Sequence, residues 1–472
     1  MESIFHGKNK LCIIDLLRER GLQMSIKKKA FVLGMARSGY EAAKFLIGKD
    51  YEVVINDAKT AQNPEHVNEL QYLGVKVVLG IHPEELFDKS FDILVKNPGI
   101  PNNHIYVQKA AEFNIPVINE LELAYRYFPK GLKIIGVTGT NGKTTVTTLI
   151  YKFLKEAGKS AYLMGNIGYP VCSFIPVLKD GDIAVMEVSD HQLCNVFEFR
   201  TDVSVMTNLF EAHVDFHGSY EKYKQVKKRI FNHHTENDIA ILNLDNSEVM
   251  DLTRDIKSTR KYFSSLKPLD SGCSVTDGWI RYNNEKIIAL EDIKIKGRHN
   301  YENAMAAIMA VKEFGVGDES IVNVLKTFGG VEHRLEYVRT VDNIDFYNDS
   351  KSTNITSTQI ALSSFNKPTI LLLGGLDRGH SFEELRPYLT YVKLIVAYGE
   401  TKHRIEEFAG RCKIPCRVVG NLEEATKTAY ESAFPGDVVL LSPACASWDQ
   451  FDNFEIRGNM FKAYIENLVN HK

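Results

Sequence analysis

Short β-rich runs alternate with helical stretches over most of the chain, and this alternation constrains the fold more than any other feature. Between residues 30 and 119 the apolar runs "AFVLG", "YEVVIND", "KVVLG" and "FDILV" are separated by segments with helical periodicity. Strands joined by crossover helices run parallel, and both faces of such a sheet are buried. The alternation resumes after residue 331 with "TILLLGG", "LIVAYG" and "DVVLLSP". The pattern therefore predicts an α/β fold built on mainly parallel sheets.

A chain of 472 residues is long enough for about three domains of this kind. We expect a Rossmann-like domain over residues 25–119, a central P-loop ATPase-like domain with a mostly parallel sheet over 120–330, and a Rossmann-like C-terminal domain over 331–472. Residues 1–24 form an extension of unclear origin that ends at a fresh start, Met24, and they are assigned no chemistry.

Charge, hydropathy and cysteine usage exclude several classes of function. The 57 basic and 60 acidic residues leave a net charge of -3, which argues against a nucleic-acid binder. No apolar run approaches the roughly 20 residues that a bilayer span needs, and the amino-terminal "LCIIDLL" lacks a signal-peptide cleavage site. Seven cysteines without a CxxC pair suit reduced thiols. We therefore expect a cytoplasmic protein, monomeric, without membrane or nucleic-acid partners.

A glycine-rich loop, "GVTGTNGKTT" at residues 136–145, follows the apolar run "LKII" and precedes a helical stretch. Its end, Gly142-Lys143-Thr144, fits a phosphate-binding loop, whereas Val137 stands where the strict pattern requires glycine. Gly139 and Gly142 still allow backbone N–H groups to turn inward, and the helix start and the lysine add positive charge. The sequence predicts a phosphate cradle; a plain strand-to-helix turn is the alternative.

Polar residues follow two apolar runs beyond this loop. Glu187 ends "DIAVME" and is a candidate metal ligand, although a solvated strand end is the alternative. "EAHVDFHG" places His213, Asp215 and His217 in one loop, at a spacing that only suggests a metal site. The basic run at residues 227–229 follows on a helix, where a solvated face is the ordinary interpretation.

Three further polar segments lie at predicted strand ends in the last region: "YNDSKSTN", "GGLDRGHSF" and "LSPACASWDQFDNF". Ligands bind at the carboxyl ends of strands in α/β sheets. Arg378 suits a carboxylate, because its planar guanidinium can bind one through two hydrogen bonds. The segments contain few catalytic bases, so we expect them to position an anionic acceptor.

Taken together, "GTNGKTT", "GNIG", "HNYENAMAA", "EHRLE", "NDSKSTN", "GGLDRG" and "SPACASWDQF" resemble the motifs of the Mur ligases. The last four are most similar to those of the D-glutamate-adding members, while "GTNGKTT" is shared with folylpolyglutamate synthases. The resemblance runs from about Ala30 to the carboxyl terminus. It implies an ATP-dependent amide ligase of peptidoglycan precursor synthesis that joins D-glutamate to UDP-N-acetylmuramoyl-L-alanine through an acyl phosphate, with ATP and two Mg²⁺ ions.

The resemblance also implies roles for individual residues. Catalysis would involve Lys143, Glu187, His213 and Lys227. Thr144 and Glu187 would hold the first Mg²⁺, and His213 and Lys227 the second. The ATP site would comprise Thr138, Gly139, Thr140, Asn141, Gly142, Lys143, Thr144, Thr145, Asn303, Arg334 and Asp349. The uridine substrate would contact Ala36, Arg37, Asp57 and Asn166. D-glutamate would contact Lys351, Thr353, Arg378, Ser447 and Phe454.

Two features of the sequence leave details open. Lys227 falls where the family carries a carbamylated lysine, with Lys228 as the rival position in "KKR". Many relatives read Ser-Ser-Phe-Gln after the metal-binding glutamate, whereas this chain has Ser-Asp-His-Gln at residues 189–192. A folate polyglutamylating ligase, which would use L-glutamate, and a nucleotide-binding regulator without ligase activity are the alternative functions.

Overall fold

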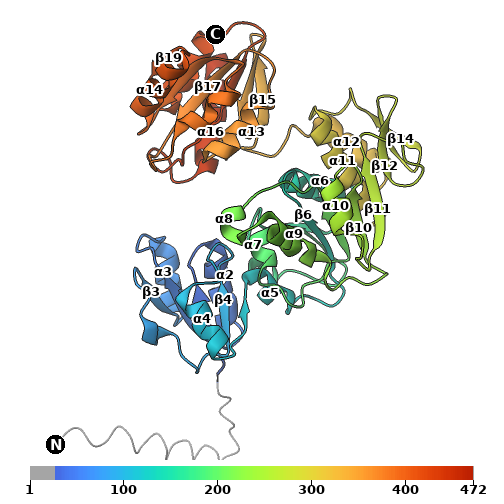
Figure 1. Cartoon of the computed structure of the whole chain (residues 1–472), viewed down its shortest axis with the longest axis vertical. Helices are drawn as coiled ribbons and strands as arrows, with labels where there is room; N and C mark the ends of the chain where they lie inside the picture. The colour runs from blue at the N-terminus through green and yellow to red at the C-terminus, as the bar shows by residue number, and fades with distance from the viewer. Residues whose placement is uncertain (1–26, 471–472) are drawn as a thin grey trace, which may run out of the picture. The chain divides into compact units, whose positions relative to one another are not determined.

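The computed structural model describes residues 27–470, so the predicted extension 1–24 lies outside the described part (Figure 1). The chain divides into two compact units. The first runs to Ile288 and includes Arg298–Ile321, and the second comprises Ala289–Gly297 and the residues from Val322 onward. Three sheets with helices on their faces confirm the predicted α/β class. Among residues 27–470 no helix combines the length and the apolar character that crossing a bilayer requires.

The first sheet has five parallel strands in the order β3-β2-β1-β4-β5. Its strands are β1 (Lys29–Leu33), β2 (Glu52–Asp57), β3 (Lys76–Leu79), β4 (Ile93–Lys96) and β5 (Val117–Ile118), and the helices that follow them are α2 (Arg37–Ile47), α3 (Pro64–Tyr72), α4 (Ile105–Glu112) and α5 (Glu120–Tyr125). In β1, Phe31 and Leu33 pack into one apolar cluster and Ala30 and Val32 into another. Burial on both faces explains why this strand is apolar throughout.

The second sheet has nine strands in the order β14-β13-β12-β11-β10-β9-β6-β8-β7. They are β6 (Lys133–Thr138), β7 (Ala161–Gly165), β8 (Ile183–Glu187), β9 (Val203–Met206), β10 (Ile239–Asn243), β11 (Thr259–Ser264), β12 (Cys273–Thr276), β13 (Trp279–Tyr282) and β14 (Glu285–Ala289). β6 pairs in parallel with β8 and with β9, whereas β12 and β13 are antiparallel. The predicted mostly parallel central sheet is confirmed.

The helices of this region are α6 (Lys143–Glu156), α7 (Asp190–Leu193), α8 (Val214–His217), α9 (Tyr220–Lys228), α10 (Ser247–Leu252), α11 (Arg298–Lys312) and α12 (Asp318–Thr327). α11 packs against α6 and is buried from Asn303 to Val311. Its small residues Ala304, Ala306, Ala307 and Ala310 allow this close approach. Helices α2 and α5 both contact the short 3-10 helix Val171–Phe174, so one continuous apolar core joins the first sheet's domain to the second.

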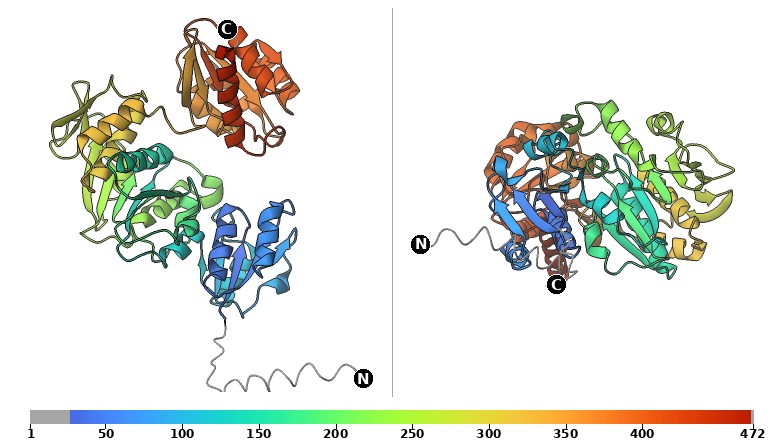
Figure 2. Two further views of the ribbon diagram at one scale, coloured as in Figure 1. Left: turned by 180° about the vertical axis from the view of Figure 1, so that it is seen from behind. Right: turned by 90° about the horizontal axis from the view of Figure 1, so that it is seen from below.

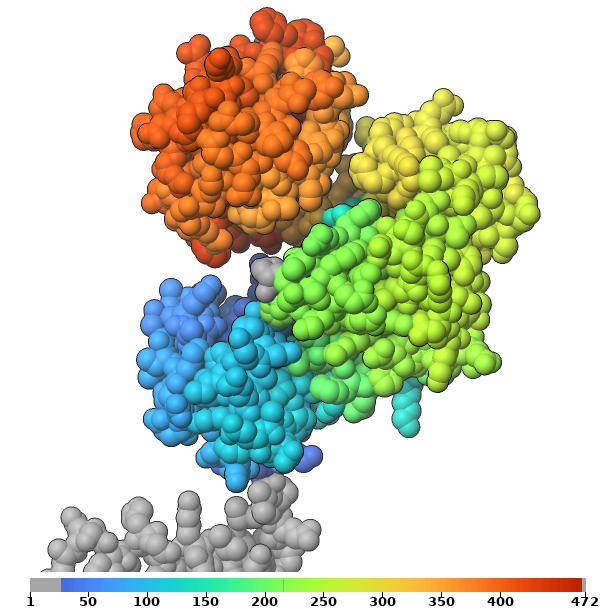
Figure 3. Space-filling view, viewed as in Figure 1, coloured from blue at the N-terminus to red at the C-terminus, as the bar shows by residue number. Residues whose placement is uncertain are grey.

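The third sheet, in the second unit, has the order β15-β16-β20-β17-β18-β19. Its strands are β15 (Glu336–Val341), β16 (Ile344–Asn348), β17 (Thr369–Gly374), β18 (Val392–Tyr398), β19 (Cys416–Val418) and β20 (Val438–Leu441), and its helices are α13 (Ile355–Leu362), α14 (Lys402–Cys412), α15 (Leu422–Glu431) and α16 (Phe454–Asn470). α16 (dark red) lies along one face of the sheet (Figure 2). All pairings of this sheet except β15 with β16 are parallel. Side chains fill the space between the elements of each domain (Figure 3).

Candidate active site

The glycine loop connects β6 to α6, and two of its glycines are required by their surroundings. Gly139 and Gly142 have φ angles of +141° and +82°. A Cβ added at Gly142 would lie 2.2 Å from the Asn303 Oδ1, and one added at Gly139 would lie 2.0 Å from the Thr207 Oγ1. Val137, at the position where the strict pattern requires glycine, is instead a buried residue of β6. The tight part of the loop therefore begins only at Gly139.

Hydrogen bonds from the end of β9 hold this loop in shape. The Thr140 and Asn141 backbone N–H groups donate to the Asn208 carbonyl and side-chain oxygens, both at 2.9 Å. The Lys143 Nζ donates to the Gly139 and Thr140 carbonyl oxygens, also at 2.9 Å. The Thr138 Oγ1 is buried without a hydrogen-bond partner among the described residues. A loop fixed in this way, at the start of a 14-residue helix, is a preformed anion cradle.

Glu187 ends β8, directly beside β6, and it is buried. The Thr144 hydroxyl donates to the Glu187 Oε2 and the Asn166 side-chain amide donates to its Oε1, each at 2.7 Å. The alternative of a solvated strand end is therefore wrong. A hydroxyl and a carboxylate that meet at the first turn after a phosphate loop form the oxygen set that Mg²⁺ prefers, so these residues fit a magnesium ion.

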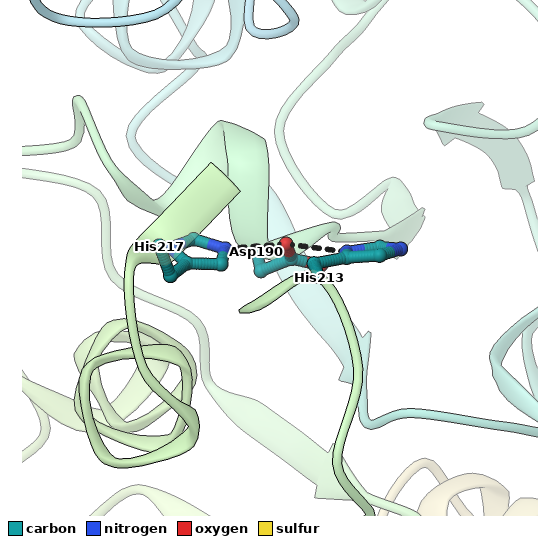
Figure 4. A group of neighbouring side chains, drawn as sticks. All are labelled: Asp190, His213 and His217. Atoms are coloured by element: carbon teal, nitrogen blue, oxygen red, sulfur yellow. Dashed lines mark hydrogen bonds and ion pairs between the residues drawn. The ribbon is translucent and has the colours of Figure 1, made fainter. Parts of the chain in front are cut away.

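A second cluster centres on Asp190, the first residue of α7. Imidazole nitrogens of His217, His213 and His191 lie 2.8, 2.9 and 3.1 Å from the Asp190 Oδ2. Figure 4 shows His213 and His217 pointing at this carboxylate from opposite sides. Burial alone would raise the pKa of Asp190, but the hydrogen bonds from the three imidazoles and the charge of Lys227 hold it well below its usual range.

Lys227 belongs to the same cluster and Lys228 does not. The Lys227 side chain is fully buried, its Nζ lies 3.4 Å from the Asp190 Oδ1, and the Tyr223 ring is 4.8 Å away. Burial, with a further contribution from the charge of Lys143, lowers the pKa of Lys227 to about 7. Lys228 instead pairs with Asp255 at 2.6 Å. The solvated-face interpretation is thus wrong for Lys227, and the geometry favours it over Lys228.

A cavity of about 570 Å³ connects these groups to the first strand-to-helix turn. Among the predicted residues, its walls include Ala36, Arg37, Lys143, Asn166 and His213. They also include residues to which the sequence analysis assigned no role: Ser38, Asn97, Glu120, Asp190 and His191.

Asp57 is not among the residues that line the cavity. Its carboxylate accepts hydrogen bonds from the Met35 and Lys59 N–H groups at 2.7 and 2.8 Å, which ties the first turn to the end of β2. The Asn97 side chain donates to the Ser38 hydroxyl at 3.2 Å. The signal for Asn97 was present in the sequence, because "KNPG" follows an apolar strand just as Asp57 does.

In the second unit Asp349 lies at the end of β16 and is buried. It accepts hydrogen bonds from the Ser352 hydroxyl, from the Ser442 hydroxyl at 2.7 Å and from the Leu335 N–H at 3.1 Å. Burial raises the pKa of Asp349 to about 6, although these hydrogen bonds and the charge of Arg334 oppose the rise.

Four of the predicted D-glutamate residues lie on three loops at the carboxyl ends of strands in this unit, and the fifth, Phe454, begins α16. The Lys351 Nζ is 5.8 Å from the centre of the Phe454 ring, and the Arg378 guanidinium is 4.7 Å from the centre of the Trp448 ring. Ser447 is buried, and its carbonyl oxygen accepts the Phe451 N–H at 2.8 Å. The Thr353 N–H donates to the Lys351 carbonyl oxygen at 2.9 Å.

Arg457, on α16, is fully buried and is a residue that sequence reasoning missed. Its guanidinium donates to the Ser350 Oγ at 2.9 Å, to the Ser350 carbonyl at 2.8 Å and to the Cys445 carbonyl at 3.0 Å. It thereby fixes the loop after β16 to the loop after β20. An arginine on an amphipathic helix gives no sequence signal of such a role.

Comparisons with known proteins agree over most of the chain. Residues 28–119 match the family model for the Mur ligase MurD-like N-terminal domain, residues 137–311 that for the Mur ligase middle domain, and residues 333–445 that for the Mur ligase glutamate ligase domain. The UDP-N-acetylmuramoylalanine–D-glutamate ligase of Geobacillus kaustophilus is 46% identical over 93% of this chain and 98% of its own. That of Bacillus subtilis is 45% identical over 92% of this chain and 96% of its own.

Solved structures extend the comparison to the fold. The UDP-N-acetylmuramate-alanine ligase of Thermotoga maritima has a TM-score of 0.59 at 18% identity and covers 94% of this chain and 100% of its own. Escherichia coli FolC, solved in complex with DHPP and ADP, has a TM-score of 0.54 at 15% identity over 74% of this chain and 92% of its own. At these identities the likeness concerns the fold alone.

Proposed function

The chain belongs to the Mur ligase family, and on that premise we propose that it joins D-glutamate to UDP-N-acetylmuramoyl-L-alanine at the expense of ATP. The identity of 46% to a D-glutamate ligase, over nearly the whole length of both chains, supports this choice within the family. The products are the dipeptide-bearing nucleotide, ADP and phosphate. The reaction serves peptidoglycan precursor synthesis, and we place it in the cytoplasm.

The reaction requires activation of a carboxylate, because an oxide leaving group is too basic for an amine to displace. Transfer of the γ-phosphoryl group of ATP to an oxygen of the alanyl carboxylate gives an acyl phosphate and ADP. The amine of D-glutamate then attacks the acyl carbon, the C–O bond to phosphate breaks, and the amine loses a proton as the amide forms. Phosphate leaves as a stable anion.

The preformed glycine loop supplies the positioning for the first step. The N–H groups at the start of α6 and Lys143 bind the β- and γ-phosphates, whereas those of Thr140 and Asn141 are held by Asn208; Asn303 lies against the loop at Gly142. We assign nucleotide binding to residues 138–145, Asn303, Arg334 and Asp349.

Thr144 and Glu187 would hold one Mg²⁺ and His213 with Lys227 a second. Bound there, the ions would offset the charge of the triphosphate and the carboxylates. We assign Lys227 the carbamylated form, in which an anionic oxygen replaces the ammonium group. Its burial and its lowered pKa support this assignment, because only a neutral amine reacts with CO2; the Asp190 carboxylate opposes the lowering of the pKa but does not cancel it.

The cavity that joins the turn of Ala36 and Arg37 to Lys143 is the observation that carries the proposal. The muramoyl-L-alanine part of the uridine substrate, which carries the reacting carboxylate, could extend through this cavity from the first domain to the phosphate loop. Asn166 lines the cavity. Asp57 does not line it, but its carboxylate accepts a hydrogen bond from the Met35 N–H and so stabilises the turn of Ala36 and Arg37.

We assign D-glutamate to the loops of the second unit that carry Lys351, Thr353, Arg378 and Ser447, and to Phe454 at the start of α16. The planar guanidinium of Arg378 can bind one carboxylate through two hydrogen bonds. The Trp448 ring beside it limits the orientations of the guanidinium.

An acceptor panel tests the proposal. Phosphate release is measured with ATP, Mg²⁺ and UDP-N-acetylmuramoyl-L-alanine, and D-glutamate, L-glutamate, L-lysine or meso-diaminopimelate is added in turn. We expect release only with D-glutamate, together with a product heavier by one glutamyl residue. Equal release with L-lysine or meso-diaminopimelate would move the chain to another member of the family. Release with L-glutamate and a pterin acid would indicate the folate-type alternative, and nucleotide binding without any release would indicate a regulator.

Light scattering should give a mass near 53.4 kDa if the protein is the monomer that we propose.

A further inference from the structure

Glu120 is a buried acidic residue on the wall of the cavity, and the reaction steps described above leave it without a role. It begins α5, directly after β5 of the first sheet, and it is only 4% exposed. Its Oε1 accepts a hydrogen bond from the Cys172 N–H, which belongs to the 3-10 helix Val171–Phe174 after β7 of the second sheet. Glu120 therefore lies where the first domain meets the second, and the small part of it that protein does not cover faces the cavity.

The surroundings of Glu120 do not compensate a negative charge. Among residues 27–470 no lysine or arginine forms an ion pair with this carboxyl, and the charged group that affects its pKa most is Glu41 on α2, which is also acidic. Burial raises the pKa of Glu120 to about 7, although hydrogen bonds from Cys172 and Val171 oppose the rise. A buried carboxylate without a cation is costly, so about half of the Glu120 side chain is the neutral acid at pH 7.

A purely structural role would not require an acid at this position. The Cys172 N–H needs only an acceptor oxygen, which the amide of a glutamine would supply equally well. A carboxylate in the first turn of a helix interacts favourably with the helix dipole only while it is charged, and burial disfavours the charge. Because Oε1 accepts the Cys172 N–H, the proton of the neutral acid belongs on Oε2, which accepts no hydrogen bond from the described residues. An O–H donor is thereby left at the cavity wall.

The two ends of the cavity indicate which part of the uridine substrate meets Glu120. We assigned the nucleotide to the turn of Ala36 and Arg37 and the reacting carboxylate to the phosphate loop at Lys143, so both ends of the bound substrate are anionic. The muramoyl-L-alanine part between them carries two uncharged amides, each with a carbonyl oxygen that accepts hydrogen bonds. Anions that enter the cavity raise the pKa of Glu120 further, so the neutral acid is the form that meets the substrate.

We propose that Glu120 is a substrate-binding residue whose Oε2–H donates a hydrogen bond to an amide carbonyl of the muramoyl-L-alanine part. This proposal rests on the proposed function, since it names the group of that substrate which Glu120 binds. The contact would fix the middle of the substrate, and with it the reach of the terminal carboxylate toward the phosphate loop. It would also disfavour nucleotide sugars that lack an amide at this position.

Calorimetric titration of the full-length protein with UDP-N-acetylmuramoyl-L-alanine, without ATP or D-glutamate, measures the contact directly. Glu120→Gln keeps an oxygen for the Cys172 N–H and presents an N–H donor to the cavity, so its Kd at pH 7 should stay within about threefold of wild type. Glu120→Leu presents no polar group, and its Kd should rise about tenfold. Glu112→Leu, the same exchange at an exposed glutamate on α4, should bind like wild type.

UDP is the control ligand, because it lacks the muramoyl-L-alanine part. The Kd for UDP should be the same in Glu120→Leu and wild type, and circular dichroism with the unfolding temperature reports whether the variant folds. An equal loss of affinity for UDP and for the complete substrate would assign the effect to the structure of α5 and overturn the proposal.

The pH dependence tests the acid form and does not depend on the leucine variant. The neutral acid predominates below pH 7 and is lost above it, so the Kd of wild type for the complete substrate should rise about tenfold between pH 6.5 and pH 8.5. Glu120→Gln should lack this rise, and the ratio of the two Kd values at each pH isolates Glu120. The other charged or titratable groups on the cavity wall or beside Glu120 are common to both proteins: Arg37, Glu41, Lys143, Cys172, Asp190, His191 and His213.

The outcomes separate the contact from the ligase activity. Equal Kd values for the complete substrate in wild type and Glu120→Leu would overturn the contact. A Glu120→Gln protein that binds as weakly as Glu120→Leu, or that follows the pH profile of wild type, would overturn the donor assignment. A protein that shows the expected binding pattern but releases no phosphate with D-glutamate would refute the ligase activity while the contact stands. A wild type that binds no UDP-N-acetylmuramoyl-L-alanine would refute the proposed function and the contact with it.

Discussion

Lys227→Ala removes a buried amine whose reactivity can be worked out from its surroundings. Burial lowers the pKa of Lys227 to about 7 from the ordinary 10.5, and the charge of Lys143 adds to this shift. At pH 7 about half of the Lys227 amine is therefore neutral, against roughly one part in 3,000 for an exposed lysine. Since only the neutral form attacks CO2, the site increases the reactive fraction on the order of a thousandfold.

The sign of the pH dependence follows from the lowered pKa. Neutral amine accumulates as the pH rises through 7, so its fraction grows about tenfold between pH 6 and pH 8. We expect enzyme that has been held in CO2-free buffer to lose phosphate-release activity. We expect CO2 to restore it, at an initial rate about tenfold higher at pH 8 than at pH 6 for a fixed concentration of dissolved CO2.

The variants complete this test. Lys227→Ala should lower kcat at least 100-fold, an amount typical for loss of a charge-stabilising group, and formate or acetate should restore part of it by placing a carboxylate in the vacated space. Lys228→Ala, at the neighbouring residue that pairs with Asp255, should stay close to wild type. Activity that is indifferent to CO2, a recovery midpoint near pH 10, or an unimpaired Lys227→Ala enzyme would each refute the reasoning.

Three further substitutions test other parts of the site. Glu187→Gln keeps the shape of the side chain but removes its charge, and kcat for phosphate release should fall at least about 100-fold while the unfolding temperature stays near that of wild type. Gly142→Ala, whose added Cβ would lie 2.2 Å from an amide oxygen, should raise KM for ATP at least about tenfold. Gly158→Ala is the control. Its φ of +71° means that the substitution should cost about 1 kcal/mol of stability, but no atom lies within 4 Å of the added Cβ, so KM for ATP should stay unchanged. An equal rise of KM for ATP in Gly142→Ala and Gly158→Ala would contradict the steric argument. Arg378→Lys should raise KM for D-glutamate about tenfold with little change for ATP, whereas Arg386→Lys, at an exposed arginine paired with Glu383, should have no effect on either constant.

The sequence was sufficient for those features that depend on local pattern. Apolar runs such as that of β1 predict strands buried on both faces, and Phe31 and Val32 indeed pack into clusters on opposite sides. The glycine loop and Glu187 were also predictable, because each follows directly from the end of a strand. Parallel neighbours bring such ends together, and the Thr144–Glu187 contact of 2.7 Å is the result.

The features that the residue pattern alone left open or did not indicate depend on the phase of a helix or on the approach of distant segments. Lys227 was predicted only through the family resemblance, with Lys228 as its rival. Lys227 and Lys228 differ by one position, and about 100° of rotation on a helix separates the buried side chain from the one that pairs with Asp255. Asp190 meets His213 and His217 only because α7 and α8 converge. No periodicity in the chain encodes that convergence, so the sequence indicated the histidines but not their partner.

Arg457 has a consequence for the design of inhibitors. The buried guanidinium of Arg457 donates hydrogen bonds to the loop after β16 and to the loop after β20. These two loops, which form part of the proposed amino-acid pocket, are therefore held at a fixed distance before any ligand binds. A conformationally rigid, cyclic mimic of D-glutamate would bind a pocket that is already preorganised, and it would lose less rotational freedom on binding than a flexible chain. Rigid scaffolds are therefore the better starting compounds against this pocket.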